Sequence, residues 1–178
     1  NPTFTYRNLT EVLLNPSQKL SEKLFTSEMA QAATRDGYGE GVVASGEENK
    51  NLVVVCCDLT ESTRSLAFKK KFPERFVQMG VSEQSMVSIA AGMALSGKVP
   101  WIASYAMFCP GRAWEQVRTN MALNETNVKI AGAHAGVSVG PDGATHQAIE
   151  DMAILRCIPK MTIIAPCDAI EAKKAVIA

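Results

Sequence analysis

The sequence predicts an α/β fold in which an open, mostly parallel β-sheet carries helices on both faces. Short apolar runs rich in β-branched residues recur along the chain, helix-like segments separate them, and polar or glycine-containing loops follow them. Strands that alternate with helices favour parallel pairing, because right-handed crossovers return the chain to the same edge of the sheet. Ligands of such sheets bind beyond the carboxyl ends of the strands, so those loops are where a site is expected.

The elements are predicted in chain order from their residue patterns. A helix-like segment over 26–44 opens at Thr26-Ser-Glu and is followed by a polar turn from Gly46. The continuous run Leu52–Cys57 is typical of a parallel strand that is covered on both faces. Further strands are predicted over 76–79, 101–103, 128–131 and 161–165. Helices are predicted over 82–96, 111–123 and 146–155, with a last helix-like run from 169.

Length and composition indicate one globular domain. The chain has 178 residues, 47% of them hydrophobic and 20% charged, and we expect an N-terminal leader over 1–24 and a single domain over 25–178. Its 18 basic and 18 acidic residues balance, so the overall field attracts neither nucleic acid nor an anionic membrane. No signal-like segment or apolar run of about 20 residues is visible, and the five cysteines form no C-x-x-C pair. We therefore expect a cytoplasmic protein with reduced thiols, and a helical run without a stop signal at Ala178 suggests a piece of a longer chain.

Glu83 follows a predicted short strand and lies in the first turn of an Ala/Gly-rich helix, within Gly80-Val-Ser-Glu-Gln84. An acidic residue after a serine cap often only complements the helix dipole, which is worth about 0.3–1 kcal/mol. The small residues Ala90-Ala-Gly-Met-Ala94 would, however, allow a flat ligand or another backbone to approach closely. Glu83 is therefore a candidate catalytic residue.

Aromatic and imidazole rings follow later strands. Tyr105 and Phe108 are spaced so that their rings could line one wall of a pocket, although loop aromatics often serve only as rim packing. Both histidines of the chain, His134 and His146, lie in one glycine-rich loop with Asp142 between them. This grouping predicts a polar site, and zinc is the weaker interpretation because the ligand spacing is unconvincing, so we predict no metal ligands in this chain.

Arg35 and Ser62 are two further candidates. The guanidinium of Arg35 offers forked donors for a phosphate, and the Ser62 hydroxyl, in the loop after the first strand, could lie beside it. Taken alone, each residue is more typical of an ordinary surface residue.

From about Phe25 to its end, the chain resembles the pyrimidine-binding domain of transketolases, particularly the split forms in which two polypeptides share one enzyme. The resemblance is carried by three motifs: Phe72-Pro-Glu-Arg-Phe76 leading into Gly80–Gln84, Gly111-Arg-Ala-Trp-Glu-Gln-Val-Arg118, and His134–Gln147. It implies the fold of thiamine-diphosphate enzymes. It also implies transfer of a two-carbon ketol unit between sugar phosphates, as in the pentose phosphate pathway.

The resemblance also implies roles at the cofactor. The residue matching Glu83 hydrogen-bonds N1′ of the aminopyrimidine and thereby activates thiamine diphosphate. Tyr105 and Phe108 would pack around the pyrimidine, although tyrosine replaces a more common phenylalanine at the first position. Asp58 matches a loop aspartate that supports the cofactor site across the subunit boundary.

For the substrates, the resemblance implies that His134 and Asp142 face the donor sugar's hydroxyls. It implies that His146 and Arg35 bind the phosphate side of the acceptor or donor, and that Ser62 adds a phosphate contact. His134 and His146 are thereby counted with Glu83 as candidate catalytic residues.

The family binds the diphosphate and its divalent metal, Mg²⁺ or another ion, through a Gly-Asp-Gly run on a separate domain, and this chain has no such run. We therefore expect a diphosphate-binding N-terminal subunit as partner, no turnover without it, and a homodimer or heterotetramer. Two alternatives stay open. One is a component of a related thiamine-diphosphate enzyme, either a deoxyxylulose-phosphate synthase or the β component of a 2-oxo-acid dehydrogenase. The other is a non-catalytic assembly module.

Overall fold

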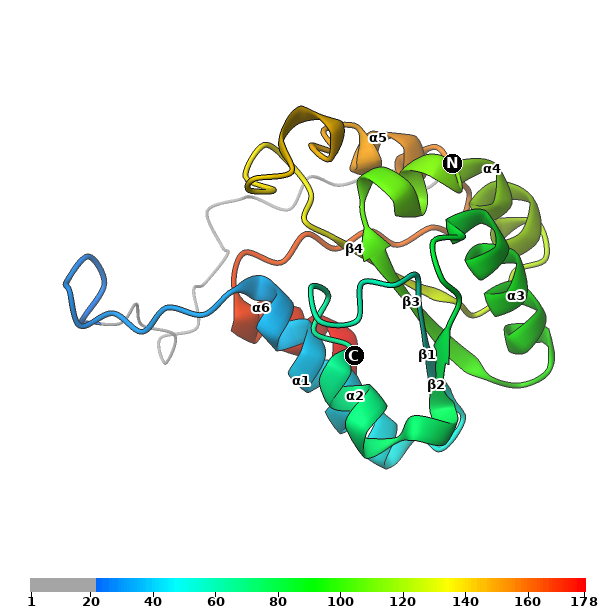
Figure 1. Ribbon diagram of the computed structural model, residues 1–178, viewed down its shortest axis with the longest axis horizontal. Helices are drawn as coiled ribbons and strands as arrows, with labels where there is room; N and C mark the ends of the chain where they lie inside the picture. The colour runs from blue at the N-terminus through cyan, green and yellow to red at the C-terminus, as the bar shows by residue number, and fades with distance from the viewer. Residues whose placement is uncertain (1–21) are drawn as a thin grey trace, which may run out of the picture. The chain divides into compact units, whose positions relative to one another are not determined.

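The computed structural model describes residues 22–178, and Ala32–Ala178 form a compact unit by themselves (Figure 1). Its strands are β1 (Leu52–Cys56), β2 (Phe76–Gln78), β3 (Val99–Tyr105) and β4 (Lys129–Ala133). Its α-helices are α1 (Thr34–Glu48), α2 (Leu66–Lys71), α3 (Glu83–Leu95), α4 (Trp114–Gln116), α5 (Asp151–Arg156) and α6 (Ala169–Ile177). Short helical segments of other pitch are η2 (Pro73–Arg75), η3 (Met107–Arg112), η4 (Val117–Ala122) and η5 (Gly143–Thr145).

The strands form one parallel sheet in the order β2-β1-β3-β4, counted over the described residues. Val55 of β1 pairs with Val77 of β2 on one side and with Ile102 of β3 on the other. Every residue of β1 is buried, as its continuous apolar sequence predicts for a central parallel strand. The predicted α/β class with an open parallel sheet is confirmed.

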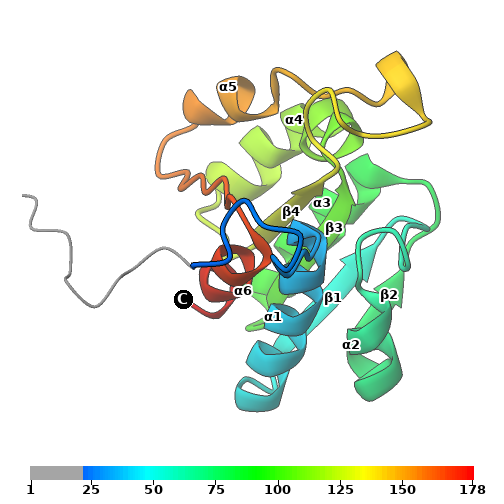
Figure 2. The ribbon, with the colours of Figure 1, turned by 90° about the vertical axis from the view of Figure 1, so that its left-hand side faces the viewer.

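Helices cover both faces of this sheet, as the two views show (Figures 1 and 2). Val54 belongs to a core with Tyr38, Val42 and Phe68, which come from α1 and α2. Its neighbour Val55 belongs to a second core, which α3, η3 and η4 supply with the buried side chains of Met86, Val87, Cys109, Val117 and Met121. Successive strand residues point to opposite faces, so one β-branched run contributes to both cores.

Helix α1 packs closely on α6, near the end of the described chain. A Cβ atom placed at Gly37 would lie 1.9 Å from the carbonyl oxygen of Ala169, and one at Gly41 would lie 2.8 Å from the Cβ of Val176. Only glycine permits this approach of the two helices. The packing fixes the first turn of α1, which carries Arg35.

Several predicted boundaries are wrong. The predicted helix over 26–44 begins instead at Thr34, because the Thr26 hydroxyl donates to the Lys23 carbonyl oxygen (2.8 Å) and accepts from the Glu28 amide (3.3 Å), which closes a turn. It also continues through Gly46 to Glu48, so the polar turn starts later. The predicted helix over 146–155 begins only at Asp151. The region predicted as one helix over 111–123 is helical but divided into η3, α4 and η4, and η3 begins earlier, at Met107. Helix α2 was not predicted.

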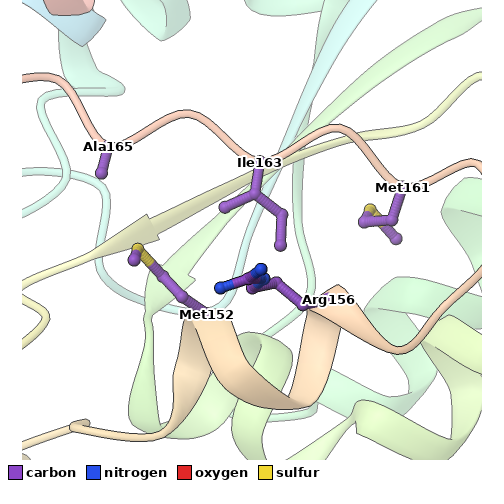
Figure 3. A pocket seen from close by; sticks show the side chains of 5 residues that line it. All are labelled: Met152, Arg156, Met161, Ile163 and Ala165. Carbon is purple, nitrogen blue, oxygen red and sulfur yellow. The ribbon is translucent and has the colours of Figure 1, made fainter. Parts of the chain in front are cut away.

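The predicted strand over 161–165 is also wrong. This segment forms no ladder with the sheet and runs past α5, where Met161 and Ile163 border a pocket of about 370 Å³ with Met152, Arg156 and Ala165. Figure 3 shows Ile163 turned toward Arg156 of α5. An apolar β-branched run favours an extended backbone, but pairing also needs a neighbouring strand in register, which the pattern does not specify.

Two further expectations concern membranes and the leader. No helix within residues 22–178 has the length and apolar character needed to cross a membrane. Residues 1–21 of the predicted leader lie outside the described part of the chain, and the boundary at residue 25 stays a prediction.

Candidate active site

The loops at the carboxyl ends of the four strands carry most of the predicted site residues. Asp58 follows β1, Glu83 follows β2, Tyr105 ends β3 and His134 directly follows β4. Because the strands are parallel, these ends lie along one edge of the sheet. The structure therefore places polar and aromatic candidates from distant parts of the sequence along the same edge.

Glu83 is the first residue of α3, and only 2% of its side chain is exposed. The preceding Ser82 donates its hydroxyl to the Met79 carbonyl oxygen (2.8 Å), which closes the turn between β2 and the helix. The buried Ser104 hydroxyl donates to Glu83 Oε1 at 3.5 Å, and Arg112 donates to Oε2 at 3.0 Å. Glu83 is thus a buried carboxylate with donors on both oxygens, whereas a helix-capping acid would face water.

Four rings lie together beside the strand ends. Tyr105 and Phe108 are nearly parallel, with ring centroids 6.5 Å apart and planes 14° apart. The His134 ring lies 4.2 Å from Tyr105, and the His146 ring stands edge-on to Phe108 at 5.0 Å. The rings of Tyr105, Phe108 and both histidines therefore form a continuous row, which we call the ring wall. That the two aromatics line a ligand pocket stays a prediction.

His134 is held in one neutral form by its surroundings. The Nη1 atom of Arg35 lies 3.1 Å from His134 Nε2, and a guanidinium can only donate, so Nε2 accepts and the proton resides on Nδ1. Burial and, next, the nearby charge of Arg35 lower the pKa of His134; Asp142 opposes them, and Arg64 adds the smallest lowering effect. Nδ1 is buried and has no hydrogen-bond partner among the described residues. His134 therefore presents a buried N–H donor without an acceptor.

Arg35 ties two loops of the site together. Besides its contact with His134, its Nη1 atom donates to the Ser62 carbonyl oxygen at 3.2 Å. Arg35 thus reaches the backbone of Ser62, and a role for the Ser62 hydroxyl stays a prediction. The other contact of Arg35 is with His134 and not with His146, with which the resemblance grouped it. His146 instead pairs its Nδ1 with the Thr145 hydroxyl at 2.8 Å.

The two aspartates of the predicted site, unlike Glu83, are exposed. Asp142 immediately precedes η5 and is close enough to His134 to influence its pKa. Asp58 has a left-handed backbone (φ 59°) and accepts from the Gln78 side-chain amide at 2.9 Å. Asp58 thus lies at the β1 end of the edge, where it joins the loop after β1 to the end of β2.

Sequence reasoning missed three side chains that shape the site. Ser104 and Arg112 hold Glu83, and Arg64 contributes charge near His134 while pairing with Asp36 at 2.6 Å. Arg112 lies inside the motif Gly111–Arg118, so its place in a distinctive motif was the available signal. Their pairings span up to 29 residues and depend on the fold.

Metal ligands are not grouped in the described part of the chain. Within residues 22–178 no cluster of three or more His, Cys, Asp and Glu side chains could hold a metal ion. The pocket of Figure 3 contains none of the predicted site residues. The chemistry available to this edge of the sheet is therefore that of a buried carboxylate, a ring wall and an arginine in contact with a neutral histidine.

Comparison with known proteins shows which family the chain belongs to. Residues 30–178 match the family model described as the pyrimidine-binding domain of transketolase. A protein of Methanocaldococcus jannaschii described as a transketolase C-terminal section is 49% identical over 142 residues, which cover 80% of this chain and 45% of that protein. Human transketolase is 37% identical over 162 residues, covering 90% of this chain and 24% of the human protein.

Solved structures give the same result. A split-gene transketolase, described as an inactive β4 tetramer, superposes with a TM-score of 0.73 at 43% identity, covering 83% of this chain and 47% of that one. Transketolase of Campylobacter jejuni superposes with a TM-score of 0.75 at 27% identity, covering 82% of this chain and 23% of that one. The chain thus spans less than half the length of these relatives. It belongs to the transketolase family, of which it carries the pyrimidine-binding domain.

Proposed function

We propose that this chain is the pyrimidine-binding component of a thiamine-diphosphate-dependent transketolase that transfers a two-carbon ketol unit between sugar phosphates. The observation that carries the proposal is the buried carboxylate of Glu83 at the start of α3, beside the wall of Tyr105 and Phe108. The residues described cover under half of the relatives, and we assign the rest of the site to a diphosphate-binding component.

The residues present fit an aminopyrimidine. A buried carboxylate that already accepts two hydrogen bonds can exchange one donor for a ring nitrogen that shares a proton with it, and near-parallel aromatic side chains can pack against a flat ring. When bound, thiamine diphosphate supplies the carbanion chemistry that breaks and forms carbon–carbon bonds beside a carbonyl. Glu83 would hold the shared proton at Oε2, while Ser104 keeps Oε1 in place. The burial of Glu83 keeps water away from the shared proton.

The substrate end fits anionic and hydroxylated sugars. Arg35 and His134 touch each other, and Ser62 lies beside them, so we assign the sugar phosphate to these three residues. His146 and Asp142 lie on the same glycine-rich loop and would receive hydroxyl groups of the sugar. This assignment differs from the resemblance in placing His134 at the phosphate, because the structure joins it to Arg35.

The diphosphate, its divalent metal and the contact expected of Asp58 belong to the proposed interface with a diphosphate-binding subunit. The assembly would be a heterotetramer, or a dimer of longer chains, and we place it in the cytoplasm.

Reconstitution tests the proposal. The full subunit is mixed with a diphosphate-binding subunit, thiamine diphosphate and Mg²⁺, and transfer from a ketose phosphate to an aldose phosphate is followed. Glu83→Gln, which keeps the shape but cannot hold the proton, should lower the transfer rate by at least about 100-fold, as expected for loss of acid–base catalysis. Glu48→Gln is the matched control, since Glu48 is exposed and is the last residue of α1, outside the proposed site. Absence of transfer by the wild-type mixture, or full activity of Glu83→Gln, would refute the proposed function.

A further inference from the structure

Arg112 donates a hydrogen bond to the carboxylate that the proposed function assigns to the cofactor. Its guanidinium donates to Glu83 Oε2 at 3.0 Å, while Ser104 reaches the other oxygen from 3.5 Å. The shorter and charged contact is the one made by Arg112, and charge-assisted hydrogen bonds are the stronger kind. In the cofactor-free chain, the best donor to Glu83 is therefore an arginine of the same chain.

Arg112 is placed so that it can leave. Glu83 is 2% exposed, but the Arg112 side chain is 48% exposed, so the ion pair joins a buried acid to a base at the surface. The guanidinium carbon lies 4.7 Å from the centroid of the Phe108 ring, in the same wall that would receive the pyrimidine. Arg112 also lines a pocket of about 470 Å³ together with Glu150 and Asp151. The pocket that Arg112 lines thus offers open space and two carboxylate side chains.

We propose that Arg112 is a positioning residue that holds Glu83 in the cofactor-free subunit and has to release Oε2 before the pyrimidine can pair with it. This inference rests on the proposed function. A buried carboxylate without a charged donor is costly, so the pair preserves the site while it is empty. The same ion pair then competes with the cofactor. The apparent affinity for the cofactor is the intrinsic affinity multiplied by the fraction of molecules in which Arg112 has released Glu83.

The competition predicts an unusual direction of change. Removing a side chain from a binding site normally weakens binding, whereas removing Arg112 should strengthen binding of the cofactor. Arg112→Met keeps the length of the chain and its contact with Phe108 but supplies no donor. Loss of one charge-assisted hydrogen bond to the competing state corresponds to about tenfold tighter binding.

The experiment is calorimetric titration of thiamine diphosphate, with Mg²⁺ present, into the complex of the full subunit and its diphosphate-binding partner. Arg112→Met should lower the dissociation constant about tenfold. Arg118→Met is the matched control, because Arg118 is also exposed and lies 5.9 Å from the Trp114 ring centroid, and it should leave affinity unchanged. Arg112→Gln, which retains a neutral donor, should give a smaller gain, and it serves in place of Arg112→Met if that variant does not assemble.

Each outcome is decisive. Unchanged or weaker binding by Arg112→Met, or by Arg112→Gln in its place, with a wild-type complex that binds the cofactor, overturns the role of Arg112 and leaves the proposed function standing. If the wild-type complex binds no thiamine diphosphate, the proposed function fails, and the inference fails with it. Tighter binding by the Arg112 variants but not by Arg118→Met supports the inference.

Discussion

The ion pair between Glu83 and Arg112 makes a quantitative prediction about stability. Arg112→Met leaves the buried carboxylate with only the 3.5 Å contact from Ser104, and an unsatisfied buried acceptor costs about 1–3 kcal/mol. Water reaches the half-exposed arginine side of the pair, so we expect a loss of about 2 kcal/mol in unfolding free energy. Glu83→Gln keeps an acceptor but loses the charge, and should cost about 1 kcal/mol.

A double-mutant cycle isolates the pair itself. Exposed ion pairs couple by less than about 1 kcal/mol, whereas removing one partner of a fully buried pair costs about 3–5 kcal/mol. One buried and one half-exposed partner place the coupling between Glu83→Gln and Arg112→Met at about 1–1.5 kcal/mol. Urea unfolding of the subunit, followed by circular dichroism, measures it if all four proteins share one m-value. A coupling below about 0.3 kcal/mol would mean that the two side chains do not pair in solution, and the reasoning about Arg112 would fall.

Three further predictions concern single side chains. Burial lowers the folded-state pKa of His134 below its ordinary value of 6.5. As pH falls, the imidazole is therefore protonated in the unfolded chain before it is protonated in the folded chain. Stability is then lost as pH falls from about 6.5 through the folded-state pKa. Urea unfolding at pH 7.5 and 5.5 should show a smaller loss for His134→Asn, which also suits the left-handed backbone (φ 53°), and an equal loss would contradict it. Gly92→Ala should stabilise the fold by about 0.5–1 kcal/mol, because a Cβ atom at this position inside α3 meets open space. Gly37→Ala should destabilise it by about 3 kcal/mol, because its Cβ would lie 1.9 Å from a carbonyl oxygen of α6. Thermal melting that ranks the two variants the other way would refute the α1–α6 packing. A thiol reagent should label only the exposed Cys157 and Cys167 of the native chain, and Cys167 more slowly because a neighbouring carboxylate raises its pKa; rapid labelling of the three buried thiols would contradict the core.

The fold was predictable wherever one segment carried its own pattern. The run Leu52–Cys57 indicates a strand buried on both faces, and β1 contributes to a core on each side of the sheet. The same reasoning failed at 161–165, because an extended apolar segment needs a partner strand that its own sequence cannot show. It also missed α2, where only six residues between two loops are helical. Short elements depend on tertiary packing more than on local preference.

The site was predictable by position and much less by contact. Strand ends indicated where Glu83, Tyr105 and His134 would lie, and the structure places them along one edge. Their roles stay predictions, because no pattern of residue types shows which donor reaches which acceptor. Arg112 illustrates the difficulty, since its partner lies 29 residues away and its guanidinium bridges a helix start and a ring.

The proposed cofactor end, at Glu83, and the proposed substrate end, at His134, differ in how far this chain satisfies its own polar groups. At the cofactor end, Arg112 and Ser104 already donate to Glu83, so a new donor has to displace one of them. At the substrate end, Arg35 fixes the tautomer of His134 and leaves a buried Nδ1–H without an acceptor in the described residues. A buried donor without a partner costs about 1–3 kcal/mol, which any acceptor oxygen placed there would recover. Under the proposed function, binding at the substrate end therefore supplies a missing acceptor, whereas binding at the cofactor end requires an exchange of hydrogen-bond donors.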